Sequence, residues 1–276
     1  MTLNLLLSYA YAPRLQMERL AAMDLADMRV LYDSGAFTVW ASGGTVELAD
    51  YAAFLGDTPL PPWRYFTLDV IGDAAASRAN YKKLRKMGLD PIPIVTTGSL
   101  PDADLKYYGK TADLIALGGL LSMSQRPERW ISHCYAKKPK DAEIHLLGKT
   151  NASLIAQYRP YSVDSSSWDI AGRYGTAHLY LGGGKMHTLK RDDIPGSSNQ
   201  LRKLIREHGV EPRDLLRGLA WRSGAQGGDE AAILSAASFI KYGDDVEARF
   251  GTKLFLAALG NRAPLVIEAY KRLEAA

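Results

Sequence analysis

The chain has 276 residues, of which 47% are hydrophobic, and it carries a net charge of +4 and a single cysteine, Cys134. This composition predicts a folded protein with a sizeable core, and it excludes general disorder, an internal disulfide and a zinc site built from several cysteines. The first residues lack the basic segment of a secretory signal, and their apolar run is too short to cross a bilayer. We therefore expect a cytoplasmic protein.

Short apolar runs, typical of buried parallel strands, recur along the first two thirds of the chain. They occupy residues 3–9, 29–33, 64–69, 91–95, 113–119, 143–148, 161–165 and 178–184. Amphipathic or capped helical segments separate most of these runs, which predicts an α/β fold with a parallel sheet. Eight strand–helix units are what a (β/α)8 TIM-like barrel needs. An open doubly wound sheet is the alternative, although no glycine-rich dinucleotide loop follows the first run.

The pattern changes at about residue 197, where helical segments replace the apolar runs. The sequence thus predicts catalytic barrel strands and helices in residues 1–196, and a helical C-terminal region, 197–276, that completes and extends the barrel. The first part of this region is basic. Each cation alone is most simply a solvated surface charge, but the group is a candidate phosphate-contacting surface. Its members are Arg202, Lys203, Arg206, Arg213, Arg217 and Arg222.

Three of the predicted strands end in an aspartate: Asp33, Asp69 and Asp164. In a barrel, all three lie at the C-terminal face, where such enzymes place their chemistry. A single aspartate there is most simply a helix cap, because Asp is common at that position. Three around one mouth are better explained by a functional site. Glycines cluster at the same predicted rim, and they let a backbone approach a flat ligand closely. They are Gly118, Gly119, Gly148 and Gly182–Gly184.

The remaining residue types narrow the chemistry. The histidines show no metal-binding spacing, and His145 and His178, which lie in predicted strands, are interpreted as interior groups. No phosphate-binding loop for ATP is present. Three carboxylates can hold Mg²⁺, but phosphate chemistry usually also needs a nearby Lys or Arg. We therefore expect no metal, no cofactor, and carboxylate chemistry at a sugar carbon or on a polar base.

The order of these motifs resembles that of the tRNA-guanine transglycosylases. DSGAF at 33–37 resembles their DSGGF signature, and ALGGL at 116–120 resembles their base-binding loop. VDSSSW at 163–168 stands where their nucleophilic aspartate lies, and Asp69 stands where they hold the guanine edge. The likeness covers roughly residues 3–184, the predicted barrel strands. Those enzymes also carry a zinc subdomain with three cysteines and a histidine, which a chain with one cysteine cannot form.

The chain is more similar to the DpdA-type DNA-guanine transglycosylases in three respects: it cannot form the zinc subdomain, it is shorter, and serines follow Asp164. Those enzymes occur in phages and in bacterial DNA-modification clusters. That family inserts 7-deazaguanine bases such as preQ0 into DNA in place of guanine. The resemblance implies DNA and the free base as partners, no membrane, no cofactor and no zinc subdomain. For a phage-encoded member it implies the host cytoplasm.

The resemblance also implies roles for the three acids. Asp164 would attack C1′ of the target nucleoside and expel guanine, and the incoming base would then displace Asp164 from the same carbon. Asp33 would be the general acid and base. Asp69 would accept hydrogen bonds from N1–H and the 2-amino group of the purine.

Other residues receive binding roles from the same resemblance. The base would be held by a rim of glycine and apolar residues, namely Phe37, Gly118, Gly119, Leu120 and Leu147. The candidate phosphate contacts come instead from the basic residues of the sequence around the predicted mouth and on the following helix, namely Lys149, Lys185, Lys190, Arg191, Arg202 and Arg206.

Three other functions remain open on the sequence. They are a tRNA-guanine transglycosylase without the zinc module, an N-glycosidase that hydrolyses the intermediate with water, and a non-catalytic barrel that binds a deazapurine or a nucleic acid. The presence of all three acids argues against a pure binding module.

Overall fold

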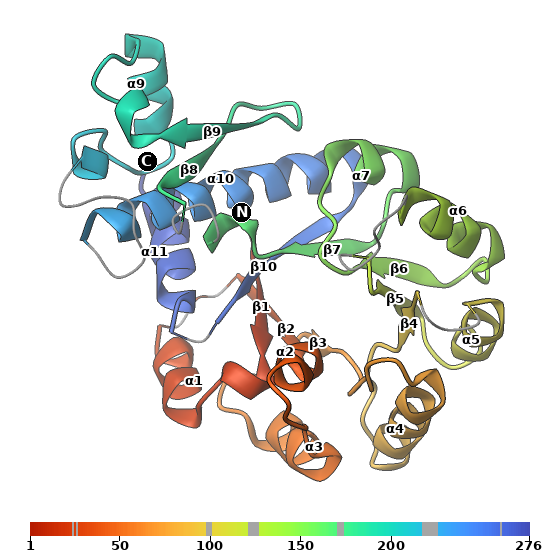
Figure 1. Cartoon of the computed structure of the whole chain (residues 1–276). Coiled ribbons are helices and arrows are strands. Elements are labelled where there is room, and N and C mark those ends of the chain that lie inside the picture. Colours follow the sequence, from red (N-terminus) through yellow and green to blue (C-terminus); the bar gives the residue numbers. More distant parts are fainter. Residues whose placement is uncertain are drawn as a thin grey trace.

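Parallel strands curl into a ring that is surrounded by helices (Figure 1). The computed structural model describes residues 1–23, 25, 27–97, 101–120, 127–169, 174–216, 226–259 and 261–276. The ring strands are β1 (Leu3–Ser8), β2 (Met28–Asp33), β3 (Arg64–Tyr65), β4 (Ile94–Thr96), β5 (Leu114–Gly118), β6 (Glu143–Leu146), β7 (Ser162–Ser165) and β10 (Lys253–Ala258). The α-helices of the described ranges are α1 (Arg14–Ala21), α2 (Ala36–Ala41), α3 (Leu48–Asp57), α4 (Ala74–Lys86), α5 (Pro101–Tyr108), α6 (Pro127–Lys137), α7 (Ala152–Tyr158), α9 (Asn199–Arg206), α10 (Gln226–Phe250) and α11 (Ala263–Glu274).

The strand order β3-β2-β1-β10-β7-β6-β5-β4 leaves β3 and β4 as the two edges of an eight-stranded sheet. These edges meet at a parallel bridge between Phe66 and Ile92. There the N–H of Thr67 donates to the carbonyl of Ile92, and the N–H of Ile92 donates to the carbonyl of Tyr65, both at 2.8 Å. The predicted fold class, an α/β TIM-like barrel, is confirmed.

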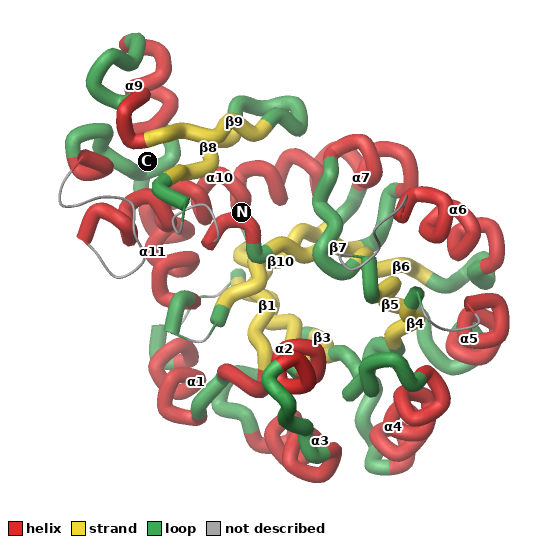
Figure 2. Tube along the Cα trace, in the orientation of Figure 1, coloured by secondary structure: helices red, strands yellow, loops and turns green. Residues whose placement is uncertain are grey.

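The eighth strand of the ring is not the predicted one. The run at 178–184 begins in β8 (Thr176–Tyr180) and continues into the turn that follows it. β8 pairs antiparallel with β9 (Met186–Lys190) as a hairpin. Figure 2 shows this hairpin and α9 to one side of the ring. The place between β1 and β7 is taken by β10, from the region expected to be helical. Residues 197–276 thus complete the barrel with a strand as well as with helices.

The glycine run explains this correction. Gly182, Gly183 and Gly184 all have positive φ and form the hairpin turn rather than a loop of the barrel rim. The N–H of Leu181 bonds the carbonyl of Lys185 at 2.9 Å across this turn. A tight turn of this kind joins antiparallel neighbours, whereas parallel strands need a long crossover. That crossover is α10, which leads into β10.

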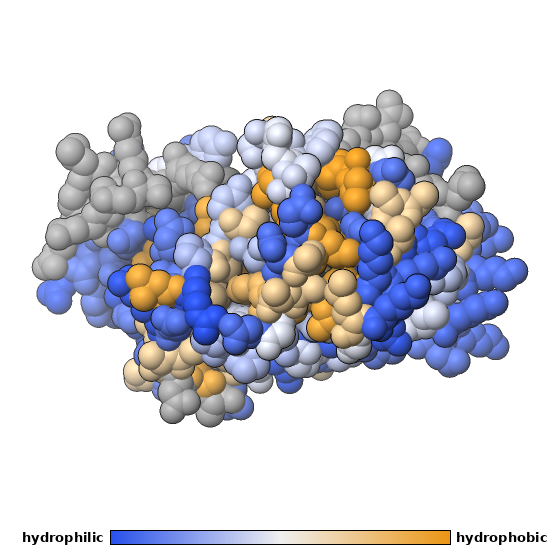
Figure 3. Space-filling model, turned by 90° about the horizontal axis from the view of Figure 1, so that it is seen from below, coloured by the Kyte–Doolittle hydropathy of each residue, from blue (hydrophilic) through white to orange (hydrophobic). Residues whose placement is uncertain are grey.

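The barrel interior holds its own apolar cluster, separate from the larger layer between strands and helices. It comprises Leu6, Leu31, Phe66, Ile92, Ile94, Leu114, Ala116 and Phe255. The Phe255 ring is fully buried and stacks on Trp63 with 5.4 Å between the ring centroids. Hydrophilic residues dominate both flanks of the barrel's outer side in Figure 3, with hydrophobic ones toward the middle. No helix in the described ranges is long and apolar enough to cross a membrane.

The strand assignment can be tested by truncating one side chain in β10 and one in the hairpin. Phe255→Ala removes a ring that fills the barrel interior, so we expect the free energy of unfolding to fall by about 3 to 5 kcal/mol. Leu181→Ala, at a position that is 49% exposed in the hairpin turn, should change it by less than about 0.5 kcal/mol. Denaturant titration of both variants measures this. Equal losses would contradict the placement of β10 in the ring.

Candidate active site

The carboxylates of Asp33 and Asp164 enter the barrel because of strand alternation. Asp33 is the last residue of β2 and lies two positions after Leu31, which faces the interior cluster. Asp164 in β7 lies two positions after Ser162, and it is paired in register with Phe255 of that cluster. Successive side chains of a strand point to opposite faces, so both acids point inward at the carboxyl ends of their strands.

Asp164 is held by groups from the neighbouring strand. Its Oδ1 accepts a hydrogen bond from the N–H of Gly148 at 2.8 Å and lies 3.1 Å from Nε2 of His145. Gly148, two residues after the end of β6, has a φ of +67°, a left-handed conformation that glycine adopts without steric cost. The Asp164 side chain remains 12% exposed. The acid is therefore anchored through one oxygen, and its side chain keeps a small exposed part.

His145 is fully buried, and both of its ring nitrogens have partners, as expected for an interior group. Nδ1 lies 2.7 Å from Oγ of Ser162, and the ring meets Phe66 edge-on at 5.0 Å. The sequence analysis did not identify its contact with Asp164. That contact depends on the register of β6 against β7, in which His145 is opposite Ser162.

Asp33 sits half-buried in a tight turn. Burial raises the pKa of Asp33 to about 6, and the charge of Asp164 adds to the rise, while N–H bonds from Gly35 and Ser34 and the proximity of His145 oppose it. Its Oδ2 accepts the Gly35 N–H at 2.8 Å. Gly35 has a φ of +77°, and a Cβ there would lie 2.5 Å from Oγ of Ser8. The glycine of the DSGAF motif is thus required by sterics.

Asp69 follows β3 and is coupled to Asp33. Burial raises the pKa of Asp69 to about 7, the charge of Asp33 contributes, and a backbone hydrogen bond opposes the rise. Burial raises the pKa of Tyr51 well above its usual value, and the charges of Asp33, Tyr65 and Asp69 add to the rise. The three acids thus form one electrostatic group, and carboxyls with a pKa near neutrality are typical of functional sites.

The predicted base-binding residues differ in their burial and contacts. Gly118 and Leu147 lie side by side, since a Cβ on Gly118 would be 3.3 Å from Cδ1 of Leu147 and 2.9 Å from Cγ2 of Ile94. Gly119 has a φ of +73°, and Leu120 is buried. Phe37, on α2, is 60% exposed.

Phe37 has an aromatic neighbour that the sequence analysis did not identify. Trp40 is 56% exposed, and its ring centroid lies 6.2 Å from that of Phe37. The two residues are three positions apart on α2, a spacing that places side chains on one helix face. The three-residue spacing of Phe37 and Trp40 in the sequence could have predicted this pair. The pair offers an exposed aromatic surface on the helix that follows Asp33.

The predicted phosphate-contacting residues are spread over the molecule. Lys149 directly follows Gly148 at the barrel mouth. Lys185 is exposed in the hairpin turn, which reaches the start of α7, because a Cβ on Gly184 would lie 2.9 Å from Cβ of Ala152. Lys149 and Lys185 thus both lie close to the amino end of α7.

The three arginines predicted to contact phosphates each have a hydrogen-bond or ion-pair partner within the protein. Arg191 donates to the Leu216 carbonyl at 3.3 Å, and Arg202 donates to Oγ of Ser197 at 3.0 Å and to the Pro195 carbonyl at 2.8 Å. Arg206 pairs with Glu211 at 3.2 Å. Lys190 is exposed at the end of β9 farther from the turn. Arg217 and Arg222 lie outside the described residues. The structure does not bring the α9 cations together with the three acids (Figure 1).

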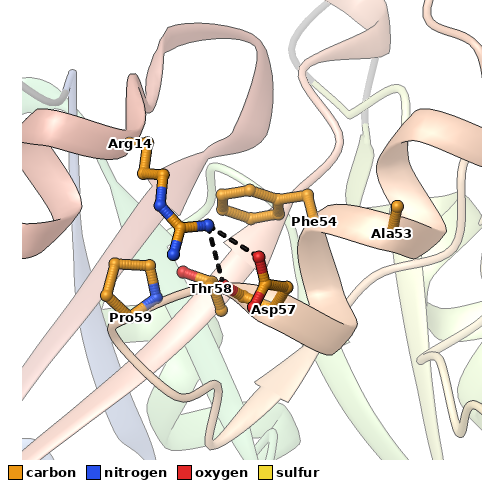
Figure 4. Close-up of a pocket in the computed structure, with 6 residues that line it drawn as sticks. All are labelled: Arg14, Ala53, Phe54, Asp57, Thr58 and Pro59. Carbon is orange, nitrogen blue, oxygen red and sulfur yellow. Dashed lines mark hydrogen bonds and ion pairs between the residues drawn. The ribbon is translucent and has the colours of Figure 1, made fainter.

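Other possible ligand sites are limited. In the part of the chain that the structure describes, no group of three His, Cys, Asp or Glu side chains could hold a metal ion. A hollow of about 230 Å³ lies elsewhere, between α1 and α3. Figure 4 shows that an ion pair between Arg14 and Asp57 closes one of its sides, at 2.7 Å. None of the three acids lines it.

Comparison with models of known protein families finds no match, and comparison with curated proteins also finds none. The function of the site must therefore be inferred from its own residues.

The raised pKa of Asp69 predicts a pH-dependent effect on stability. An aspartate titrates near 3.8 in the unfolded chain and this one near 7 in the folded protein, so the folded protein binds the proton more tightly and its stability falls as pH rises between those values. Asp69→Asn removes this penalty. Relative to the parent protein, we expect the variant to gain roughly 1 to 2 kcal/mol at pH 8 and almost nothing at pH 4.

Asp113 serves as a control of opposite sign. The Arg64 guanidinium lowers its pKa, so its contribution to stability is present above the unfolded pKa and is lost in acid. Asp113→Asn should therefore destabilise the protein at pH 8 and have little effect near pH 3. Thermal unfolding of both variants across this range gives the comparison. A loss of stability for Asp69→Asn at pH 8 would contradict the burial of its charge.

Proposed function

We propose that the protein is a DNA-guanine transglycosylase, which exchanges guanine in DNA for a 7-deazaguanine base such as preQ0 through a covalent intermediate on Asp164. The observation that carries this proposal is the anchoring of Asp164. Its Oδ1 contacts Gly148 and His145, while Oδ2 has no hydrogen-bond partner among the described residues. One oxygen is held and the other is available as a nucleophile.

The first displacement opens the glycosidic bond. Oδ2 of Asp164 attacks C1′ as the bond from C1′ to N9 of guanine breaks, and the electron pair of that bond leaves with the base. Asp33 donates a proton to the departing guanine. A pKa of about 6 suits this role, because a general acid and base works best when its pKa lies near the working pH.

The second displacement restores both acids. N9 of the incoming 7-deazaguanine attacks C1′, the bond from C1′ to Asp164 breaks, and Asp33 takes the proton that N9 loses. The proton given in the first step is thus recovered in the second. Two inversions at C1′ retain the β-configuration, and the cycle needs no nucleotide cofactor.

Asp69 is the proposed selectivity residue. As a carboxylate it accepts from N1–H and the 2-amino group, the edge that distinguishes guanine from adenine. Two donors from a bound base favour the ionised form, so base binding should lower the pKa of Asp69 from about 7. Gly118 packs closely against Leu147, and these two residues would offer an apolar surface on which a flat base could lie.

The target nucleotide must leave the base stack to reach the mouth, at a cost of a few kcal/mol. Phosphate contacts from Lys149 and Lys185 would offset part of this cost. The choice of DNA over tRNA rests on the resemblance to the DpdA-type enzymes.

The nucleophile can be tested by replacing Asp164. Asp164→Asn should abolish base exchange, with a loss on the order of 10³-fold or more, because an amide cannot form the glycosyl ester. Asp57→Asn, at a side chain that is 80% exposed and away from the three acids, is the matched control and should retain activity. The measurement is mass spectrometry of a trapped DNA–protein adduct. An adduct on Asp33, or exchange by the Asn variant, would overturn the assignment.

The DNA surface can be tested through salt dependence. Each lost phosphate contact should reduce the steepness of log K against log salt by roughly 0.7 to 0.9. Lys149→Ala combined with Lys185→Ala should show this reduction while binding of free preQ0 stays unchanged. Arg202→Ala combined with Arg206→Ala should show less of it, because both guanidiniums have local partners. Fluorescence anisotropy measures both pairs. Unchanged slopes in both would mean that DNA approaches over another surface.

A further inference from the structure

We propose that Ser162 and His145 position Asp164 through a buried hydrogen-bond chain, in which the Ser162 hydroxyl donates to Nδ1 of His145 and Nε2–H of His145 donates to Asp164. We call these three residues the Asp164 chain. Its role in orienting a nucleophile rests on the proposed function. The hydrogen-bond directions do not, because they follow from the contact distances together with the donors and acceptors that each side chain offers.

The geometry of the Asp164 chain comes from two adjacent strands. Ser162 and Asp164 are two positions apart in β7 and share its inward face, and His145 of β6 is paired in register with Ser162. The imidazole therefore bridges the two β7 side chains, 2.7 Å from Oγ of Ser162 and 3.1 Å from Oδ1 of Asp164. Ser162 and His145 are fully buried.

The direction of each hydrogen bond follows from what each group can offer. An ionised carboxylate only accepts, so Nε2 of His145 must carry the proton that Asp164 receives. A neutral imidazole then has a lone pair at Nδ1, which requires a donor. The Ser162 hydroxyl has a single proton and supplies it. Ser162 thus favours one tautomer of His145, the one that can donate to Asp164.

This arrangement places both donors on one oxygen of the acid. The N–H of Gly148 and Nε2–H of His145 converge on Oδ1, which resists rotation of the carboxylate and leaves Oδ2 toward the mouth. The edge contact with Phe66 restricts the imidazole ring. The same donors stabilise the negative charge that returns to Asp164 when the incoming base displaces it. His145 is therefore a positioning residue, which acts through Asp164.

The tautomer can be measured without any substrate. In the full-length protein with ¹⁵N-labelled histidine, NMR should show a protonated Nε2 and an unprotonated Nδ1 at His145, assigned by the signals that disappear in His145→Gln. Ser162→Ala should shift the Nδ1 signal toward that of an unbonded nitrogen. A protonated Nδ1 at His145 in the parent protein, with or without a proton on Nε2, would overturn the proposed directions.

The positioning role has a kinetic test. We expect the single-turnover rate of adduct formation to fall roughly 10- to 150-fold in His145→Leu, which loses a donor to a charged group, and roughly 2- to 13-fold in Ser162→Ala. His145→Gln retains an N–H donor and should recover part of the loss. Calorimetric binding of free preQ0 should be unchanged in all three, because Asp69 recognises the base.

A buried serine elsewhere supplies the control. Ser235 is fully buried and accepts a hydrogen bond from the N–H of His178 at 2.9 Å. Ser235→Ala should lower stability without slowing adduct formation. An unchanged adduct rate in His145→Leu, or equal slowing in Ser235→Ala, would overturn the positioning role. If the parent protein forms no DNA adduct at all, the proposed function fails, and the NMR result still tests the hydrogen-bond directions.

Discussion

The alternation of side chains along the barrel strands is the constraint on which the site depends. Asp33 takes the last inward position of β2, and Ser162 and Asp164 take successive inward positions of β7. A slip of one residue in either strand would turn its acid to the helix layer, where nothing in the proposed chemistry could reach it. The register of β6 against β7 then places His145 opposite Ser162. The same strand pairing thus positions both the interior apolar cluster and the acids at the carboxyl ends of the strands.

Burial of Asp33 and Asp69 costs stability, and the structure offsets only part of that cost. Burial raises the pKa of Asp33 to about 6 and that of Asp69 to about 7, and mutual repulsion contributes to both. The N–H of Gly35 opposes the rise in the pKa of Asp33, and the N–H of Gly148 holds Asp164. Both glycines have positive φ values, which are costly for other residues. A cluster kept at such a cost favours a function over a structural explanation.

Local sequence features predicted most of the barrel and the acids at its mouth, because an apolar run that ends in aspartate is visible without any long-range information. The eighth strand was predicted wrongly, since 178–184 and β10 are both short apolar runs and only their partners distinguish a hairpin from a ring strand. The contact of His145 with Asp164 was missed for a related reason, because it is set by the register of residues 19 positions apart. The local hydrogen bonds of Arg202 could not be predicted either, because charge alone does not show which cations already have hydrogen-bond partners within the protein.

The central proposal is that the protein exchanges guanine bases in DNA. Its most direct test is incubation of the full-length protein with radiolabelled guanine and either a guanine-containing DNA duplex, the same duplex as single strands, or bulk tRNA. DNA that lacks guanine serves as the blank. The account predicts label in at least one guanine-containing DNA form and none in tRNA. Label in tRNA alone, or in no nucleic acid, would contradict it.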